Sequence, residues 1–566
     1  MKKLLMAMML MPLLALADTW TDPKTGIEWT YVISDGMAQV GTGDAYYKSP
    51  AISSSTTGAL TIPAVLGGCP VTSIADYAFY YCGKLTSVAI SSSVTSIGNS
   101  AFVGCWNLTS VSIPSGMTSI GESAFSNCSA LQSIVIPLSV VHIGKYAFNG
   151  TKLWSDAPRG PVIINNCLVD TKNYYPTGDF VVPEGVRLIA DRTYEMIPDM
   201  TSVKISDGVR IIGTGAFWKC PRLKTVTLAS SVESVGEKAF SDCESLLQLK
   251  IPDGVKSIGA SAFYNCKNLS SLTIPASVDK IGGAAFEYCS GLVSLTIMEG
   301  IKDVGSGAFA GCQSLQSVTL PNSVTNLGAR VFSRCSGLTS AVIPNSVSAI
   351  ADSAFAYCSK LTAMKIPQSV TSIGNSAFEY CKELKEVEMP ASVERIGVSA
   401  FQGCSGVTYI SIPANVTSIE SSVFMGCKGL ISVAIPSSVT NIGYQAFRGC
   451  SGLMSFSTPL NLKSIDYEAF YGCSGLTKVE ISEGVTDIGV RAFYGCSNLG
   501  DGVVVVDNCV LCVNGVCPSL VDLPQGVRLI AGGAFFDCGG LESITLPLGL
   551  LSIGDSAFSN CGSLTS

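Results

Sequence analysis

Hydrophobic and polar positions repeat along this chain with a period of 23 residues. In one unit the apolar positions include Leu108, Val111, Ile113 and Phe125. An aromatic residue at the position of Phe125 recurs about twenty times between positions 79 and 558. Such a strict period predicts a solenoid, in which each unit is one coil that buries its hydrophobic face against the next coil.

Each coil is predicted to contain one short strand and one return segment. Val111 and Ile113 alternate with polar residues, as the two-residue period of a strand requires. Pro114 ends the strand, because proline cannot donate a hydrogen bond to the ladder. Ala124 and Cys128 lie four residues apart, as one or two helical turns would place them. We therefore expect a parallel sheet on the concave face of the solenoid and short helical or irregular return segments.

Two coils are longer than the others, near residues 149–193 and 494–534. Residues 162–167 of the first resemble residues 504–509 of the second. Both coils then return through a proline and the same Gly-Val-Arg-Leu-Ile-Ala segment. We interpret them as one inserted hairpin module that is used twice within a single array covering residues 60–566.

The two ends of the chain differ from the array. Residues 1–17 combine two lysines, an apolar run and Ala15-Leu16-Ala17, which are the parts of a secretory signal peptide. The apolar run is too short to cross a bilayer core, which needs roughly twenty residues, so we expect no membrane span in the mature chain. Residues 18–59 lack the repeat, and their alternating apolar residues predict an N-terminal β-hairpin cap. The chain stops at Ser566 inside a unit without a polar capping segment, so we expect further sequence beyond it.

The unit Ile-Pro-x-Ser-Val-Thr-x-Ile-Gly-x-x-Ala-Phe-x-Gly-Cys-x-x-Leu, as at residues 435–453, resembles the BspA-type leucine-rich repeat. The resemblance covers about residues 60–566, and it implies an α/β solenoid of about twenty 23-residue coils. It also implies a secreted or surface-bound protein of bacteria or parasitic protists, because characterised members act as adhesins for extracellular matrix or host cells. The repeats of this family are structural, so the resemblance carries over no catalytic or ligand-binding residue.

Eighteen of the 23 cysteines fall in the repeat register. The five others are Cys69, Cys167, Cys509, Cys512 and Cys517. Register cysteines of adjacent coils would lie about 5 Å apart, which is within disulfide range, and export favours oxidation. The alternative is that each register cysteine is a buried thiol that packs as a small hydrophobic side chain. We favour buried thiols, because the unbroken run of thirteen from Cys220 to Cys496 cannot pair completely within itself.

The cysteines outside the register suggest one covalent link. Cys512 and Cys517 flank Asn514-Gly515, and Asn-Gly is the strongest two-residue hairpin turn. Such a turn would set the two cysteines opposite each other, so we predict a disulfide between Cys512 and Cys517. A zinc site at Cys509, Cys512 and Cys517 would lack a fourth ligand, since the only histidine, His142, is far away in the sequence. We therefore expect no metal.

Composition argues against catalysis and against nucleic acid as a partner. The chain has 35 basic and 42 acidic residues, which leaves no cationic field for phosphate backbones. A single histidine removes the commonest general base near neutral pH. The glycines follow the repeat and form no nucleophile elbow, Walker loop or dinucleotide fingerprint. We expect neither an enzymatic activity nor a cofactor.

The outward positions of the predicted strands are mostly hydroxyl residues, in two columns along the sheet. These positions include Ser110 and Ser112, Thr225 and Thr227, Ser271 and Thr273, Ser294 and Thr296, Ser317 and Thr319, and Ser543 and Thr545. One coil departs from the pattern, because Glu386 and Glu388 share this face with Lys365 on one neighbouring coil and Tyr409 on the other. The simplest interpretation is a salt-linked surface patch, and the functional one is that these four residues bind a ligand.

Together these features predict a secreted or cell-surface protein that binds an extracellular protein or glycoconjugate through the concave face. The partner could belong to a host matrix or a host cell surface. The alternative is a structural spacer or envelope component without a specific ligand. Uniform Ser/Thr columns fit this alternative as well, since both residues suit an exposed sheet.

Overall fold

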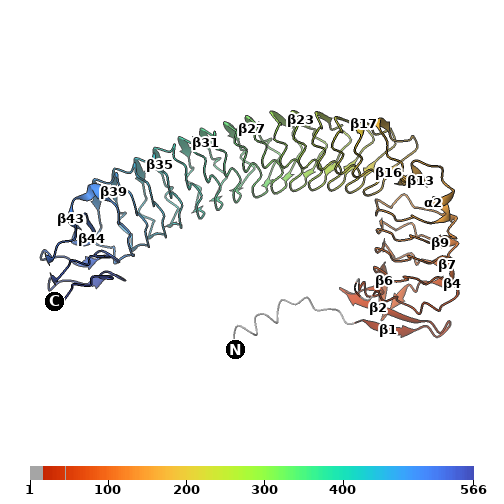
Figure 1. Ribbon diagram of the computed structural model, residues 1–566, viewed down its shortest axis with the longest axis horizontal. Helices are drawn as coiled ribbons and strands as arrows, with labels where there is room; N and C mark the ends of the chain where they lie inside the picture. Colours follow the sequence, from red (N-terminus) through yellow and green to blue (C-terminus); the bar gives the residue numbers. More distant parts are fainter. Residues whose placement is uncertain (1–16, 45, 47) are drawn as a thin grey trace. The chain divides into compact units, whose positions relative to one another are not determined.

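The computed structural model describes residues 17–566 except positions 45 and 47. The predicted signal peptide therefore lies outside the described residues in all but its last position. The chain forms two compact units, one ending at Glu244 (unit 1) and one starting at Ser245 (unit 2). Both are solenoids of short parallel strands, which confirms the predicted fold class (Figure 1).

Most coils contribute a longer strand to one face and a two-residue strand to another. In unit 1, for example, β9 (Ser110–Ser112) pairs in parallel with β7 (Leu85–Ala89), and β10 (Ser119–Ile120) pairs in parallel with β8 (Ser96–Ile97). We call the two sets of strands the long-strand face and the short-strand face. Corresponding residues pair 23 positions apart, as Val88 and Val111 do, so the period in the sequence is the register of the sheets.

In unit 1 the other strands of the long-strand face are β4 (Gly58–Thr61), β11 (Ser133–Ile134), β15 (Gly178–Val181), β17 (Met200–Lys204) and β19 (Thr225–Thr227). The other strands of its short-strand face are β6 (Cys69–Ile74), β12 (His142–Ile143), β16 (Leu188–Ile189), β18 (Ile211–Ile212) and β20 (Ser234–Val235).

In unit 2 the long-strand face consists of β21 (Gln248–Lys250), β23 (Ser271–Ile274), β25 (Ser294–Ile297), β27 (Ser317–Thr319), β29 (Ser340–Val342), β31 (Ala363–Lys365), β33 (Glu386–Glu388), β35 (Tyr409–Ser411), β37 (Ser432–Ala434), β39 (Ser455–Ser457), β41 (Lys478–Glu480), β45 (Leu520–Asp522) and β47 (Ser543–Thr545). Its short-strand face consists of β22 (Ser257–Ile258), β24 (Lys280–Ile281), β26 (Asp303–Val304), β28 (Asn326–Leu327), β30 (Ala349–Ile350), β32 (Ser372–Ile373), β34 (Arg395–Ile396), β36 (Ser418–Ile419), β38 (Asn441–Ile442), β40 (Ser464–Ile465), β42 (Asp487–Ile488), β46 (Leu529–Ile530) and β48 (Ser552–Ile553).

The long-strand face of unit 2 lies on the outer edge of that unit's curve, with the short-strand face inside it (Figure 1). The sheets agree with this placement. On the outer edge many strands pair only two by two, such as β31 with β33, whereas β36, β38, β40 and β42 form a continuous sheet on the inner edge. Strands on the outside of a curve are spread further apart, which interrupts their hydrogen bonds. This placement differs from the concave sheet expected from the sequence.

The return segments are irregular turns, which is one of the two forms expected from the sequence. Ser123 and Asn127 adopt the left-handed conformation, with φ of 55° and 59°, which an α-helix cannot accommodate. The backbone amide of Phe125 donates to the carbonyl of Ala147 in the next coil at 2.7 Å. Hydrogen bonds between coils therefore replace the helical hydrogen bonds that the spacing of Ala124 and Cys128 had suggested.

A column of stacked phenylalanines runs through the core of each unit. The rings of Phe102 and Phe125 are 5.2 Å apart and nearly parallel, as are those of Phe286 and Phe309 at 5.5 Å. These side chains are fully buried. Offset stacking of this kind adds to the burial of apolar area, so the aromatic position holds successive coils in register.

The serine of the Ile-Pro-x-Ser-Val-Thr segment links successive coils. The hydroxyl of Ser369 donates to the carbonyl of Val347 at 2.6 Å, and Ser438 donates to Val416 at 2.7 Å. Each bond satisfies a partly buried carbonyl that the short strands leave unpaired. The recurrence of this serine in the repeat therefore has a structural cause.

Each of the two longer coils contains a β-hairpin. β13 (Val162–Ile164) pairs with β14 (Cys167–Asp170), and β43 (Gly502–Val506) pairs with β44 (Cys509–Asn514). The two-residue turns are Asn165-Asn166 and Asp507-Asn508, and all four residues have positive φ. In both modules the second strand joins the short-strand face, β14 beside β16 and β44 beside β46.

Each inserted hairpin follows a coil whose backbone carbonyls, in the described part of the chain, receive no serine hydrogen bond from the next coil. An arginine side chain donates to these carbonyls instead. Arg187 donates to the carbonyls of Val140 and Pro137 at 3.0 and 2.9 Å. Arg528 makes the equivalent bonds to Val485 and Ser482. The arginine of the shared Gly-Val-Arg-Leu-Ile-Ala segment thus replaces the serine bond of an ordinary coil.

The N-terminal part of unit 1 is an antiparallel sheet that covers the first coil. It consists of β1 (Asp18–Thr21), β2 (Glu28–Ser34) and β3 (Met37–Val40), and β3 then pairs in parallel with β6. Trp29 is buried here and packs edge-on against Phe79 of the first coil. The remaining elements are β5 (Val65–Leu66), the short helix α2 (Lys152–Asp156) and the 3₁₀ turn η1 (Ser497–Leu499).

Candidate ligand-binding surface

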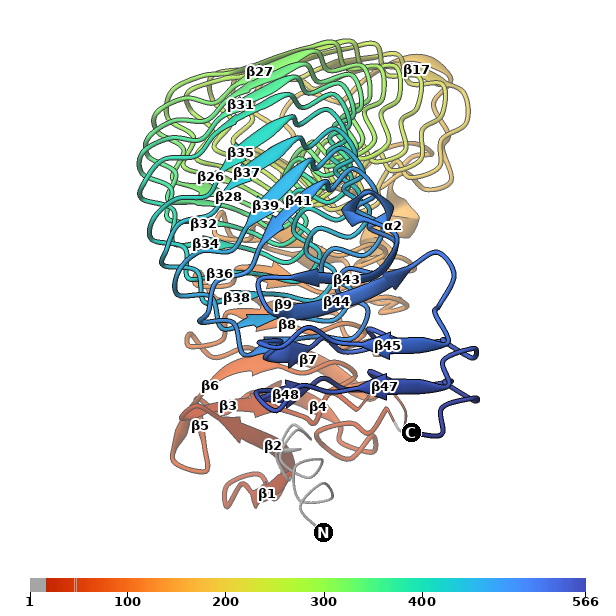
Figure 2. The same cartoon turned by 90° about the vertical axis from the view of Figure 1, so that its left-hand side faces the viewer.

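The four candidate residues lie together on the long-strand face of unit 2. β31 pairs in parallel with β33, which sets Lys365 directly beside Glu388. β35 follows β33 on the same face and carries Tyr409 at the position of Glu386. Figure 2 shows the next strands, β35 and β37, β39 and β41, continuing this face side by side.

Strand alternation exposes these four side chains. Met364 and Ile410 point into the core and are almost fully buried, whereas Glu386 and Glu388 are exposed. The Tyr409 side chain is 54% exposed. The sequence-based expectation of their exposure is therefore confirmed.

The two carboxylates on β33 are not neutralised locally. In the part of the chain that the structure describes, neither Glu386 nor Glu388 forms an ion pair with Lys365. The salt-linked interpretation is therefore wrong for this patch. The geometry leaves two negative charges and one positive charge beside an exposed tyrosine ring.

A second charged position on the same face behaves differently. Lys478 and Glu480 on β41 form an ion pair at 2.6 Å, and the hydroxyl of Ser457 also donates to Glu480. Hydrogen bonds from Lys478 and Ser457 lower the pKa of Glu480, and the contact with Glu480 raises the pKa of Lys478. This pair is internally satisfied and is a natural comparison for the unpaired carboxylates of β33.

Other strands of the long-strand face carry hydroxyl residues at both outward positions. Ser271 and Thr273 are exposed on either side of buried Leu272, and Ser317 and Thr319 repeat the arrangement on β27. The predicted columns of Ser and Thr are confirmed on these strands. The patch around Glu386 therefore differs from these hydroxyl-bearing strands of the same face.

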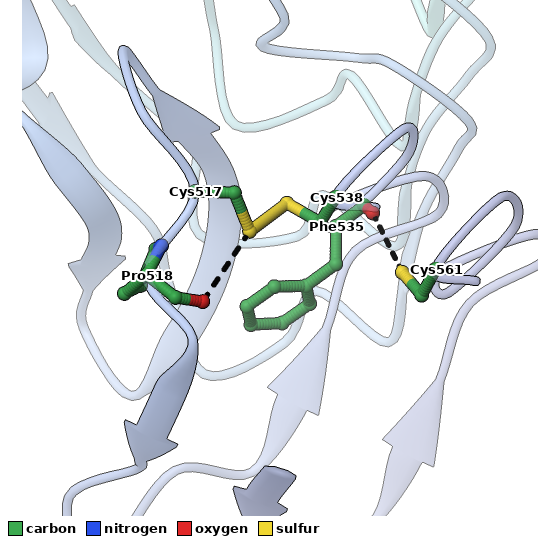
Figure 3. The surroundings of a disulfide bond; sticks show 5 residues. All are labelled: Cys517, Pro518, Phe535, Cys538 and Cys561. Carbon is green, nitrogen blue, oxygen red and sulfur yellow. Dashed lines mark hydrogen bonds between the residues drawn. A yellow bond between two sulfur atoms is a disulfide. The ribbon is translucent and has the colours of Figure 1, made fainter. Parts of the chain in front are cut away.

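The predicted disulfide between Cys512 and Cys517 is wrong. Cys517 pairs with Cys538 across a Cα separation of 5.5 Å (Figure 3). Cys512 is a buried free thiol. The reason is the choice of turn, because Asp507-Asn508 closes the hairpin and β44 runs on through Asn514 without reversing. Cys512 stays in the core, and Cys517 reaches the next return segment.

Most register cysteines are buried free thiols, as favoured from the sequence. The thiol of Cys128 donates to the carbonyl of Phe102 at 3.0 Å, and Cys335 does the same to Phe309 at 3.2 Å. Burial raises the pKa of the Cys427 thiol to about 12. Cys538 is the register cysteine that forms the disulfide with Cys517. Among the described residues, no group of three or more His, Cys, Asp or Glu side chains could hold a metal ion.

Sequence reasoning missed a set of aromatic residues on the return segments. Tyr357 and Tyr380 stack at 5.2 Å, with the Arg334 guanidinium 5.1 Å from the Tyr357 ring. Tyr471 and Tyr494 stack in the same way at 5.5 Å. These tyrosines stand one or two residues before a register cysteine, and that spacing was the available signal. Because each ring covers its neighbour, mainly the ring edges remain open.

The sequence matches the family described as BspA type leucine rich repeat region, in six copies. The matched residues are 66–156, 172–293, 284–408, 399–505 and 517–566. The chain belongs to the BspA-type leucine-rich-repeat family. A search of curated proteins finds no match. No helix in the described part of this BspA-type protein is long and apolar enough to cross a membrane.

Several crystal structures are similar to this BspA-type protein at low identity. A leucine-rich repeat protein from Bacteroides ovatus is 22% identical over 89% of this chain and 98% of its own, with a TM-score of 0.31. The pneumococcal vaccine antigen PcpA is 16% identical over 96% of this chain and 99% of its own, with a TM-score of 0.36. A leucine rich cell surface protein from Faecalibacterium prausnitzii is 24% identical over 74% of this chain and 94% of its own, with a TM-score of 0.28.

Proposed function

We propose that this protein acts outside the cell as a binding or adhesion protein and recognises an extracellular protein or glycoconjugate. The recognition surface is the long-strand face of unit 2. The residues that determine which partner binds there are Glu386, Glu388, Lys365 and Tyr409. The observation that carries the proposal is the pair of exposed carboxylates, neither of them in an ion pair with Lys365, beside an exposed tyrosine on a face where many outward positions carry hydroxyl groups. Aromatic residues and accessible charges are the side chains that most often dominate binding energy and orientation.

Export is the second part of the proposal. The N-terminal segment has the three parts of a signal peptide, and residues 1–17 are removed after Ala17. The test is N-terminal sequencing of the protein recovered outside the producing cell. A first residue of Asp18 supports export, and recovery of the intact N-terminus from inside the cell contradicts it.

The decisive binding experiment uses the purified protein on an array of matrix glycoproteins, mucins, polysaccharides and whole cells. Replacement of Glu386 and Glu388 by lysine should abolish saturable binding, because it reverses the charge that the partner faces. The control exchanges two other exposed acidic residues of unit 2, Glu483→Lys and Asp487→Lys, which changes the net charge by the same amount. Loss of binding in the first variant alone supports the proposal. Equal binding by both variants and the unmodified protein removes the patch from the mechanism.

A structural spacer is the second candidate function. The observation that favours it is the repetition of hydroxyl residues on strands such as β23 and β27, because a spacer needs length and solubility but no specific contact. The same array separates the two functions. Absence of saturable binding to every surface would favour the spacer over the binding protein.

A further inference from the structure

The first inserted module borders a polar hollow in unit 1. Its volume is about 600 Å³, which is in the range of small-molecule sites. It is lined by the loop after β14 and by the return segments on either side of the module. Its charged lining residues are Lys145, Asp170, Asp191, Arg192, Glu195 and Asp199.

An ion pair lies largely buried in this hollow. Lys145 contacts Glu195, and their side chains are only 19% and 14% exposed. Arg192 Nε lies 3.8 Å from the second oxygen of Glu195. Burial acts to lower the pKa of Lys145, but the contacts with Glu195 and Tyr146 together outweigh it and keep the pKa above its usual value. Burying charges is costly even when they are paired, so the arrangement calls for a cause other than stability.

The second module shows that the fold does not require these charges. Asp170 in β14 pairs with Val162, and Cys512 pairs with Val504 at the same place in β44. Counted from the shared Gly-Val-Arg-Leu-Ile-Ala segment, the residue equivalent to Glu195 is Phe536. Counted from the preceding phenylalanine, the residue equivalent to Lys145 is Val490. The same backbone is thus built once with buried charges and once with Cys, Phe and Val.

Two oxygens at the hollow also lack a hydrogen bond from any described residue. Asp170 Oδ2 and Glu195 Oε2 are buried and, within the described part of the chain, have no hydrogen-bond partner. Buried polar atoms without a partner are rare, because leaving one unsatisfied destabilises the fold. The equivalent residues of the second module, Cys512 and Phe536, carry no such oxygen. The presence of these two oxygens in the first module therefore indicates a functional constraint.

The chemistry of the lining selects the kind of ligand. Carboxylates outnumber cations, which disfavours an anion, whereas Lys145 and Arg192 disfavour a simple cation. Asn173 adds a donor and an acceptor, and the Tyr146 and Tyr175 side chains are 44% and 60% exposed. A neutral ring with many hydroxyls donates to carboxylates, accepts from cations and packs its apolar face on tyrosine.

We propose that this hollow binds one saccharide residue of a glycan. Hydroxyl groups of the sugar donate to the carboxylates and accept from Lys145 and Arg192, and Tyr175 packs against the ring. The site belongs to unit 1 and is independent of the patch around Glu386. A saccharide can therefore be bound whether or not the long-strand face of unit 2 recognises a partner.

The test is titration of the purified full-length protein with glycans that a printed glycan array identifies. The main variant, Lys145→Val with Glu195→Phe, copies residues that the second module already uses in the same fold. We expect at least about tenfold weaker binding, since charge-assisted hydrogen bonds are lost. Asp170→Asn and Tyr175→Ala test the lining with little risk to folding, and each should weaken binding as well. The control is Arg210→Gln with Glu233→Gln, which removes an exposed ion pair of unit 1 outside the hollow.

The outcomes separate this proposal from its competitors and from the proposed function. A glycan that binds the control and the Glu386→Lys, Glu388→Lys variant normally, but not the hollow variants, supports the saccharide site. The proposal is overturned if no glycan binds, or if the hollow variants bind as tightly as the unmodified protein. Binding of spermidine in place of a saccharide would overturn it in favour of a cation site.

Discussion

Replacing Phe309 by alanine should open the middle of unit 2 locally rather than weaken the unit evenly. Phe309 is fully buried and stacks on Phe286 at 5.5 Å and on Phe332 at 5.7 Å. Loss of a buried phenylalanine costs about 3–5 kcal/mol. A coil of 23 residues contributes only about 1–3 kcal/mol of net stability at ordinary values per residue. The substitution therefore removes more free energy than the coil itself supplies.

Hydrogen exchange measured by mass spectrometry checks this prediction. In a solenoid each coil contacts only its neighbours, so exchange should accelerate in the coils that contain Phe286, Phe309 and Phe332, and it should stay slow in the coils of Phe401 and Phe447. Ser317→Ala, an exposed change in the same coil as Phe309, should leave exchange within the scatter of the unmodified protein. Uniform acceleration throughout unit 2 would refute the reasoning, because it would mean that the array unfolds as one cooperative block.

Three further predictions concern particular residues. Cys517→Ser should lower the melting temperature under oxidising conditions and leave it close to that of the unmodified protein under reducing conditions, and peptide mapping should recover Cys517 linked to Cys538. Ser422→Gly should stabilise unit 2 by about 0.5–1 kcal/mol in urea unfolding, because Ser422 has a φ of 57° that glycine adopts without strain. Burial raises the pKa of Asp191, so its contribution to stability is present below pH 3.8 and is lost as the pH rises through the raised value. Asp191→Asn should therefore stabilise unit 1 at neutral pH and flatten the pH dependence of its urea midpoint.

The strands and the core could be predicted from the sequence because both follow from short residue patterns that repeat in every coil. Val111 and Met364 are buried where alternation placed them. The return segments could not be predicted in the same way. The four-residue spacing of Ala124 and Cys128 fits a helix, but the conformation of Asn127 is decided by hydrogen bonds to the next coil. No single coil contains that information.

In the candidate sites too, features set by local sequence could be predicted, whereas features set by contacts between coils could not. The exposure of Glu386 and Tyr409 follows from strand alternation, whereas the lack of an ion pair depends on side-chain positions across coils. The disulfide prediction failed because two turn sequences competed, and pairing of β44 with β46 favours Asp507-Asn508. The hollow in unit 1 joins Lys145 to Glu195 across 50 residues. Comparison of the two modules residue by residue was the signal that could have found it.

The reactivity of the register thiols reports local unfolding of individual coils. A folded coil hides its thiol, and burial holds the pKa of Cys427 and Cys473 at about 12, so almost no reactive thiolate exists near neutral pH. An opened coil exposes a thiol of ordinary acidity that an alkylating reagent captures. Within the run from Cys220 to Cys496 these thiols are spaced 23 residues apart, one in each coil. The labelling pattern after a brief pulse of reagent would therefore show which coils unfold locally and how often they do so.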